Sequence, residues 1–164
     1  MRPAAILALA VFAAGAARGQ LAPPNASGVT MGHLHIRAAD VEQHRRFWVE
    51  GFGAQPGKFG PHHLLKLPGA YVLIQKGEQG AGTEGSTVGH IGLKVRDLKG
   101  TVDRLKAAGF DVPQPVARQA MFNGPDGIRI ELVEDASLAG PLALHHLHFY
   151  TPAPAEIQAW YARI

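Results

Sequence analysis

A short sequence pattern occurs three times in this chain. The copies begin at His33, His90 and His146, and so start 57 and 56 residues apart. Each copy has His first, an aliphatic residue second and an apolar residue fourth, and the first two copies add Asp at the eighth position (Asp40 and Asp97). Internal repetition at this period indicates copies of one supersecondary unit, each of which buries its apolar face against another copy.

The residues in each copy predict a strand followed by a helix. The alternation of polar and apolar residues favours a strand. Asp40 and Asp97 are good helix N-caps, because a carboxylate accepts the free amide hydrogens of a first turn. Apolar stripes at helical spacing follow and stop at Gly51 and Gly109, which suit helix ends. Further strands are expected at about 58–67 and 71–75 in the first copy, and at 116–122 and 128–134 in the second.

The expected fold is α+β. Two β-α-β-β(-β) units, 29–77 and 86–134, pair and together make one domain at 29–134. Residues 135–143 are expected to be a linker, and 144–164 to be the start of a second domain, a third unit that this sequence leaves incomplete. A strand and a helix cannot bury an apolar face alone, so this segment predicts a longer two-domain protein or a docking partner.

The N-terminal residues predict export. Residues 1–19 combine an early Arg, an apolar run of about 11 residues and small residues before Gln20, as a signal peptide does. The run is too short to span a bilayer, which needs about 20 residues. We therefore expect a periplasmic or extracellular protein without stable membrane insertion, and a flexible segment at 20–28. A retained N-terminal anchor is the alternative.

The composition of the chain limits which classes of partner and of metal ligand we expect. The net charge of +3 includes Arg2 and Arg18 of the expected signal peptide, and the remaining chain has 14 basic and 13 acidic residues, scattered along it. This distribution does not favour nucleic acid as a partner, and a homodimer stays open as the assembly. The chain has no Cys, so a metal would need imidazole, carboxylate or amide ligands.

His33, His90 and Glu131 are the candidate ligands of one divalent metal ion. If the two units pair about a twofold axis, the first strands lie side by side and both imidazoles face one cavity. Glu131 lies between Ile130 and Leu132, where a carboxylate is costly unless it is paired or bound to a metal. Two imidazoles and a carboxylate suit Fe, Mn, Ni, Zn or Co. The alternative is that the histidines are ordinary core or surface residues and Glu131 an edge charge.

The sequence resembles the vicinal oxygen chelate superfamily. The resemblance rests on His33 and Asp40 before the first helix, on Phe47-Trp48-x-x-Gly51-Phe52-Gly53 at its end, and on Gly-Pro-Asp-Gly-x-x-Ile-Glu-Leu at 124–132. It covers 31–134 and restarts at 145. That superfamily contains glyoxalase I, extradiol dioxygenases, fosfomycin-resistance enzymes, methylmalonyl-CoA epimerase and bleomycin-binding proteins.

The resemblance implies a glyoxalase-like fold, in which paired βαβββ units form a half-open β-barrel, with metal ligands at His33, His90 and Glu131. A fourth ligand of glyoxalase I would fall near Leu73, which cannot bind a metal, and Gln75 is the nearby substitute. The expected function is an exported, metal-dependent lyase or isomerase acting on a small oxygenated substrate. An extradiol-type dioxygenase and a non-catalytic binding protein of the bleomycin-resistance type are the alternatives.

Five more residues are candidates for a functional role. Strand parity places His35 beside His33 and Arg129 beside Glu131. His35 could then act as a general acid or base, and Arg129 could hold an anionic substrate. In the simpler reading, His35 packs between strands and Arg129 points to solvent. His145, His146 and His148 suggest a second metal site in the unfinished unit, which this chain could not complete.

Overall fold

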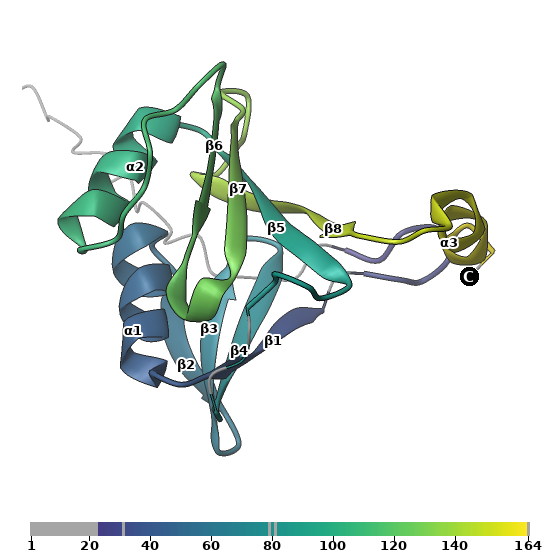
Figure 1. Ribbon diagram of the computed structural model, residues 1–164, viewed down its shortest axis with the longest axis horizontal. Coiled ribbons are helices and arrows are strands. Elements are labelled where there is room, and N and C mark those ends of the chain that lie inside the picture. Colours follow the sequence, from purple (N-terminus) through teal and green to yellow (C-terminus); the bar gives the residue numbers. More distant parts are fainter. Residues whose placement is uncertain (1–22, 31, 79, 81, 164) are drawn as a thin grey trace, which may run out of the picture.

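The computed structural model describes residues 23–30, 32–78, 80 and 82–163, so the expected signal peptide lies outside the described residues. The first unit forms a four-stranded sheet in the order β1-β4-β3-β2 (Figure 1). The Asp40 carboxylate accepts the Gln43 N–H and caps the helix, as predicted. The elements are β1 (His33–Ala38), α1 (Val41–Arg46) with the π-helical turn η1 (Phe47–Gly51), β2 (Gln55–Phe59), β3 (His62–Leu67) and β4 (Ala70–Lys76).

The second unit repeats this plan with one strand fewer. Asp97 caps its helix through the Gly100 N–H, again as predicted. Where the first unit has β2, the second has an isolated bridge between Val116 and Gln119. Its elements are β5 (Val88–Val95), α2 (Leu98–Ala107), β6 (Gln119–Asn123), the short helix η2 (Pro125–Gly127) and β7 (Arg129–Glu134).

The third unit supplies one more strand to the second sheet. β8 (Leu142–Phe149) pairs antiparallel with β5, which gives the order β6-β7-β5-β8. The following helix α3 (Pro154–Tyr161) stands clear of the body in Figure 1 and has no buried residue. The α+β prediction is therefore confirmed, with two sheets that do not close and a third unit that is incomplete.

Three expectations about strands are wrong. Residues 58–67 do not form one strand, because Gly60 adopts a left-handed φ of 56° and reverses the chain between β2 and β3. The strand expected from residue 116 begins at Gln119, since Ala117 and Arg118 also have positive φ. β1 and β5 lie in different sheets, and β8 occupies the edge of β5 that β1 was expected to take.

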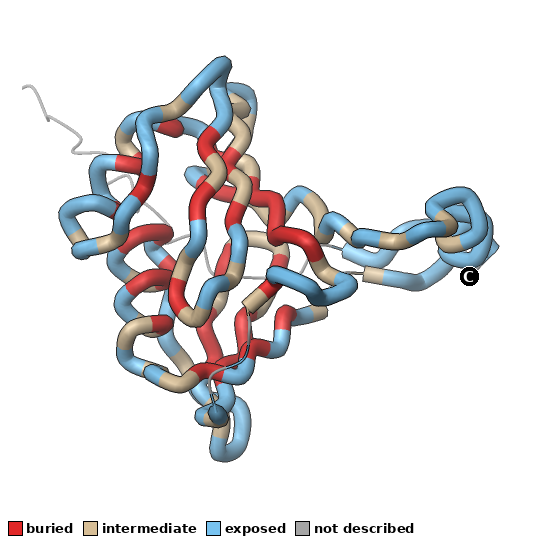
Figure 2. The backbone as a smooth tube through the Cα atoms, viewed as in Figure 1, coloured by how far each residue is buried: buried red, intermediate tan, exposed pale blue. Residues whose placement is uncertain are grey.

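The two units share one hydrophobic core. Figure 2 marks in red the buried positions along the helices and the strands of both sheets. Phe47 lies at the centre of the core. The Phe47 ring lies edge-on to Trp48, at 5.1 Å between centroids, and to Phe110 of the second unit, at 4.9 Å. Edge-to-face aromatic pairs add to the stabilisation that burial provides. The core thus holds the second sheet in a fixed position relative to the first unit.

None of the helices in the described part is long and apolar enough to cross a membrane.

A buried polar contact also joins the units. His44 of α1, with a side chain 1% exposed, places Nε2 3.0 Å from Oδ2 of Asp126 in η2. The same oxygen accepts the N–H of Ala39. The carboxylate can only accept, so Nε2 carries the hydrogen of the neutral imidazole, and the buried Nδ1 has no partner among the described residues. Burial lowers the pKa of His44 more than Asp126 raises it.

Acid should therefore destabilise the fold through His44. Its pKa in the folded state is below the ordinary value, so the unfolded chain binds more protons, and the free energy of unfolding should fall as the pH drops below about 6.5. Urea denaturation between pH 8 and 5 measures this slope. The variant His44→Gln keeps a donor for Asp126 and removes the titration, so its slope should be shallower. An unchanged slope would contradict the assignment.

Candidate metal centre

β5 has one apolar and one polar face. Ile91 and Leu93 point into the core, so His90 and Gly92 lie on the opposite face of the sheet. On β7, Glu131 stands opposite Gly92, and on β8, His146 stands opposite Gly92 and His148 opposite His90. Three neighbouring strands thus present a carboxylate and three imidazoles on one face.

The polar atoms of this cluster converge. Nε2 of His90 lies 3.0 Å from Nε2 of His146, and Oε2 of Glu131 lies 3.4 Å from the first nitrogen and 3.3 Å from the second. Ligand atoms of His148 lie within 4.8 Å of those of His90 and His146. His90 and His146 are therefore common to two trios, one completed by Glu131 and the other by His148.

These separations fit a shared divalent cation. Zinc ligands lie about 2.0–2.1 Å from the ion, which places neighbouring ligands of a tetrahedral site roughly 3.3 Å apart. The three measured separations lie close to that value. Two imidazoles with a carboxylate or a third imidazole are ligands for Zn, Fe, Mn, Co and Ni. The residues present therefore fit the expected metal, without choosing among these ions.

The electrostatics of His90 suit a ligand. Burial lowers its pKa, Glu131 opposes this, and the neighbouring His148, His146 and Arg129 lower it further. A metal binds the neutral imidazole, so a lowered pKa removes competition from protons. Exposure rises outward from a buried His90 through Glu131 and His146, whose side chains are 9%, 15% and 32% exposed. The centre is thus anchored in the sheet and open to solvent on one side.

A cavity of about 520 Å³ includes Arg129 and Tyr150 in its walls. Arg129 precedes Glu131 by two residues on β7, and the Tyr150 ring lies 5.5 Å from that of His148, so the cavity borders the cluster. The Arg129 guanidinium makes no hydrogen bond or ion pair within the described ranges. A cation of this kind can hold the carboxylate or phosphate of a ligand through two hydrogen bonds.

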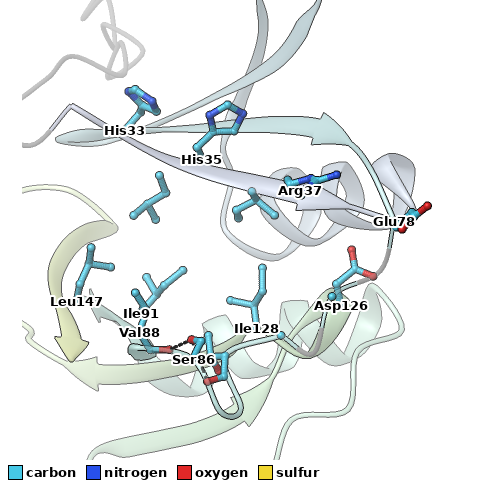
Figure 3. Close-up of a pocket in the computed structure, with 15 residues that line it drawn as sticks. His33, His35, Arg37, Glu78, Ser86, Val88, Ile91, Asp126, Ile128 and Leu147 are labelled. Atoms are coloured by element: carbon cyan, nitrogen blue, oxygen red, sulfur yellow. Dashed lines mark hydrogen bonds between the residues drawn. The ribbon is translucent and has the colours of Figure 1, made fainter. Parts of the chain in front are cut away.

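His33 and His35 lie elsewhere. Both belong to β1 and line a different cavity, of about 610 Å³, which has Ile91 and Leu147 on its far wall (Figure 3). The ring of His35 contacts those of His33 and His62 at centroid distances of 6.1 and 5.8 Å. The structure therefore brings together His90 and Glu131 of the predicted triad, whereas the ligand role of His33 stays a prediction. Gln75 is exposed and borders a third pocket.

Sequence reasoning set His146 and His148 aside as part of an unfinished site. The repeat itself contained the signal that could have found them, because His146 occupies the same position of the pattern as His33 and His90. The repeat could not reveal whether β1 or β8 pairs with β5.

Comparison with known proteins establishes the family. The family model described as Glyoxalase/Bleomycin resistance protein/Dioxygenase superfamily matches residues 30–132. The chain belongs to this superfamily. The match ends before β8, so the family model includes His90 and Glu131 but neither His146 nor His148.

Relatives of this superfamily member agree with the assignment. A "Probable lactoylglutathione lyase" of Vibrio parahaemolyticus serotype O3:K6 (strain RIMD 2210633) is 28% identical over 129 residues, covering 67% of this chain and 94% of the relative. A solved structure of a possible glyoxalase from Bacillus cereus is 25% identical with a TM-score of 0.52, covering 63% of this chain and 96% of that one. The fosfomycin resistance protein FosX of Mesorhizobium loti is 22% identical with a TM-score of 0.52, covering 66% and 92%, and supports the fold.

Proposed function

We propose that this protein is a divalent-metal-dependent lyase or isomerase that acts on a small substrate with neighbouring oxygen atoms. The observation that carries the proposal is the convergence of His90 and Glu131, whose polar atoms lie 3.4 Å apart on an open face of the second sheet. Both residues lie within the region matched by the family model. A bound divalent ion would act as a Lewis acid that stabilises negative charge on a substrate oxygen.

The protein's own residues would bind and orient the substrate. Glu131 and His90 would hold the ion on a strand pair whose opposite face is fixed in the core. The guanidinium of Arg129, which has no partner among the residues that the structure describes, gives the cavity a place for an anionic group of the substrate. His35 stays a predicted acid or base. Lactoylglutathione, named in the Vibrio relative, has adjacent oxygens and carboxylates, so it is the first compound to test.

Metal content and turnover test this proposal together. Protein loaded with Fe(II), Mn(II), Ni(II), Co(II) or Zn(II) in turn should retain about one ion per chain by elemental analysis, and at least one loaded form should change lactoylglutathione or a related hydroxy-carbonyl compound. Removing a ligand should cost more than the roughly 10- to 100-fold loss typical of residues that only support ligands. His90→Ala and Glu131→Ala should therefore lose the ion and the activity.

His63→Ala is the matched control, because His63 is an exposed histidine on β3, away from the cluster. It should retain both metal and turnover. A wild-type protein that stays metal-free with all five ions would overturn the enzyme proposal. If that protein still bound small molecules, the ligand-sequestering alternative would gain.

We also propose that the protein is exported, on the strength of the pattern in residues 1–19. The full chain expressed in a Gram-negative bacterium should then be recovered from the periplasm with Gln20 as its first residue. Leu9→Arg places a charge in the apolar run and should leave the uncleaved chain in the cytosol. N-terminal sequencing of each fraction measures this. Wild-type protein that keeps its first 19 residues in the cytosol would contradict export.

A further inference from the structure

We infer that the third unit completes the metal centre, with His146 of β8 as the second imidazole ligand beside His90. This inference rests on the proposed metal-dependent function and changes which units form the site. The centre would be built by the second and third repeats, whereas the family resemblance implies the first and second. β8 would then contribute a metal ligand to the site.

The first argument is the geometry of the shared point, which is the space between the donor atoms of His90, Glu131 and His146. Nε2 of His146 lies as close to His90 and Glu131 as those two lie to each other, with separations of 3.0 and 3.3 Å against 3.4 Å. Three donors with nearly equal spacing can surround one ion.

The second argument is the shape of β5. A Cβ atom built on Gly92 would lie 2.2 Å from Cε1 of His146, and one built on Gly89 would lie 2.6 Å from the ring of Tyr150. Real Cβ atoms do not approach other atoms so closely. A residue with a side chain at either position would push β8 or its rings away. Both glycines thus make room for β8, and the sequence of β5 itself supports this pairing.

The third argument is an irregularity in β8. Gly92 pairs with His146 and the next residue of β5 pairs with Leu144, so His145 is an extra residue in the strand. Such a bulge re-aims the neighbouring side chain, and bulges are common beside functional sites. Nδ1 of His145 lies 2.9 Å from Nδ1 of His146. A hydrogen bond to this second nitrogen would fix the ring while Nε2 faces the shared point.

His33 is poorly placed for the same role. It occupies the same position of the repeat as His146, but its strand pairs with β4 in the first sheet. β8 already occupies the free edge of β5, and Leu147 of β8 lines the cavity that His33 also borders. For His33 to reach Glu131, β1 would have to displace β8 from that edge.

Cobalt binding to the full chain tests the inference, because the visible spectrum of bound Co(II) reports the number and type of ligands independently of turnover. The matched variants are His146→Ala and His33→Ala. We expect His146→Ala to weaken Co(II) binding by at least about tenfold and to alter the visible bands. His33→Ala should bind within about twofold of wild type with the same spectrum. Circular dichroism checks that both variants fold.

Glycine variants provide a second test that leaves every ligand in place. Gly92→Ala should displace the His146 ring and weaken Co(II) binding in the same way. Gly57→Ala is its control, since a Cβ at Gly57 of β2 would meet its nearest neighbours at an ordinary 3.7 Å. If His146→Ala fails to fold, Co(II) binding by His146→Gln and by the two glycine variants still tests whether His146 is a ligand.

The outcomes separate this inference from the proposed function. Loss of Co(II) binding in His33→Ala together with normal binding in His146→Ala would overturn the inference and leave the metal-dependent function standing. Normal Co(II) binding in both variants, together with loss of Co(II) binding in His90→Ala, would also overturn the inference and leave the metal-dependent function standing. Absence of Co(II), Zn(II), Fe(II), Mn(II) and Ni(II) binding in wild-type protein would overturn both.

Discussion

The rest of this structure depends on the two different faces of β5. One face carries Ile91 and Leu93 into the common core, and the other carries His90 toward Glu131. Because side chains alternate along a strand, a shift of one residue would exchange the two faces, placing the imidazole of His90 in the apolar core and moving core residues to the polar face. The core therefore fixes the register, and the register fixes the polar cluster. β5 also has a neighbour on each side, β7 and β8, so residues distant in sequence meet across it.

Local features of the fold were predictable because their causes are local. Asp40 and Asp97 cap helices through residues three positions later, and apolar periodicity marked the helices that follow. A polar partner for Glu131 was also predictable, since a carboxylate between two apolar residues of a strand needs one, and His90 and His146 lie 3.4 and 3.3 Å from it. By contrast, the break between β2 and β3 lies at Gly60, which has a positive φ. The dipeptide Gly60-Pro61 is a turn signal, and the expectation of one strand over 58–67 gave it too little weight.

The partner of β5 was not predictable, because the same repeat occurs in both competing strands. β1 and β8 each begin the pattern with a histidine, so either could bring an imidazole to His90. The choice depends on long-range packing, which sequence similarity between the copies cannot express. The decisive residues lie on β5: Gly89 and Gly92 leave room for the rings of Tyr150 and His146. A glycine inside a strand often marks a close approach of this kind.

The arrangement also explains how a unit that is incomplete by itself can be held in place. α3 buries none of its residues, so it contributes little to docking β8. β8 depends instead on its ladder of backbone pairs with β5 and on Leu142, which is buried, with Leu144 and Leu147 packed against the core. A metal bound between His90, Glu131 and His146 would add a cross-link between β5, β7 and β8. Metal binding and the docking of β8 would then stabilise each other, since each requires the same arrangement of the three strands.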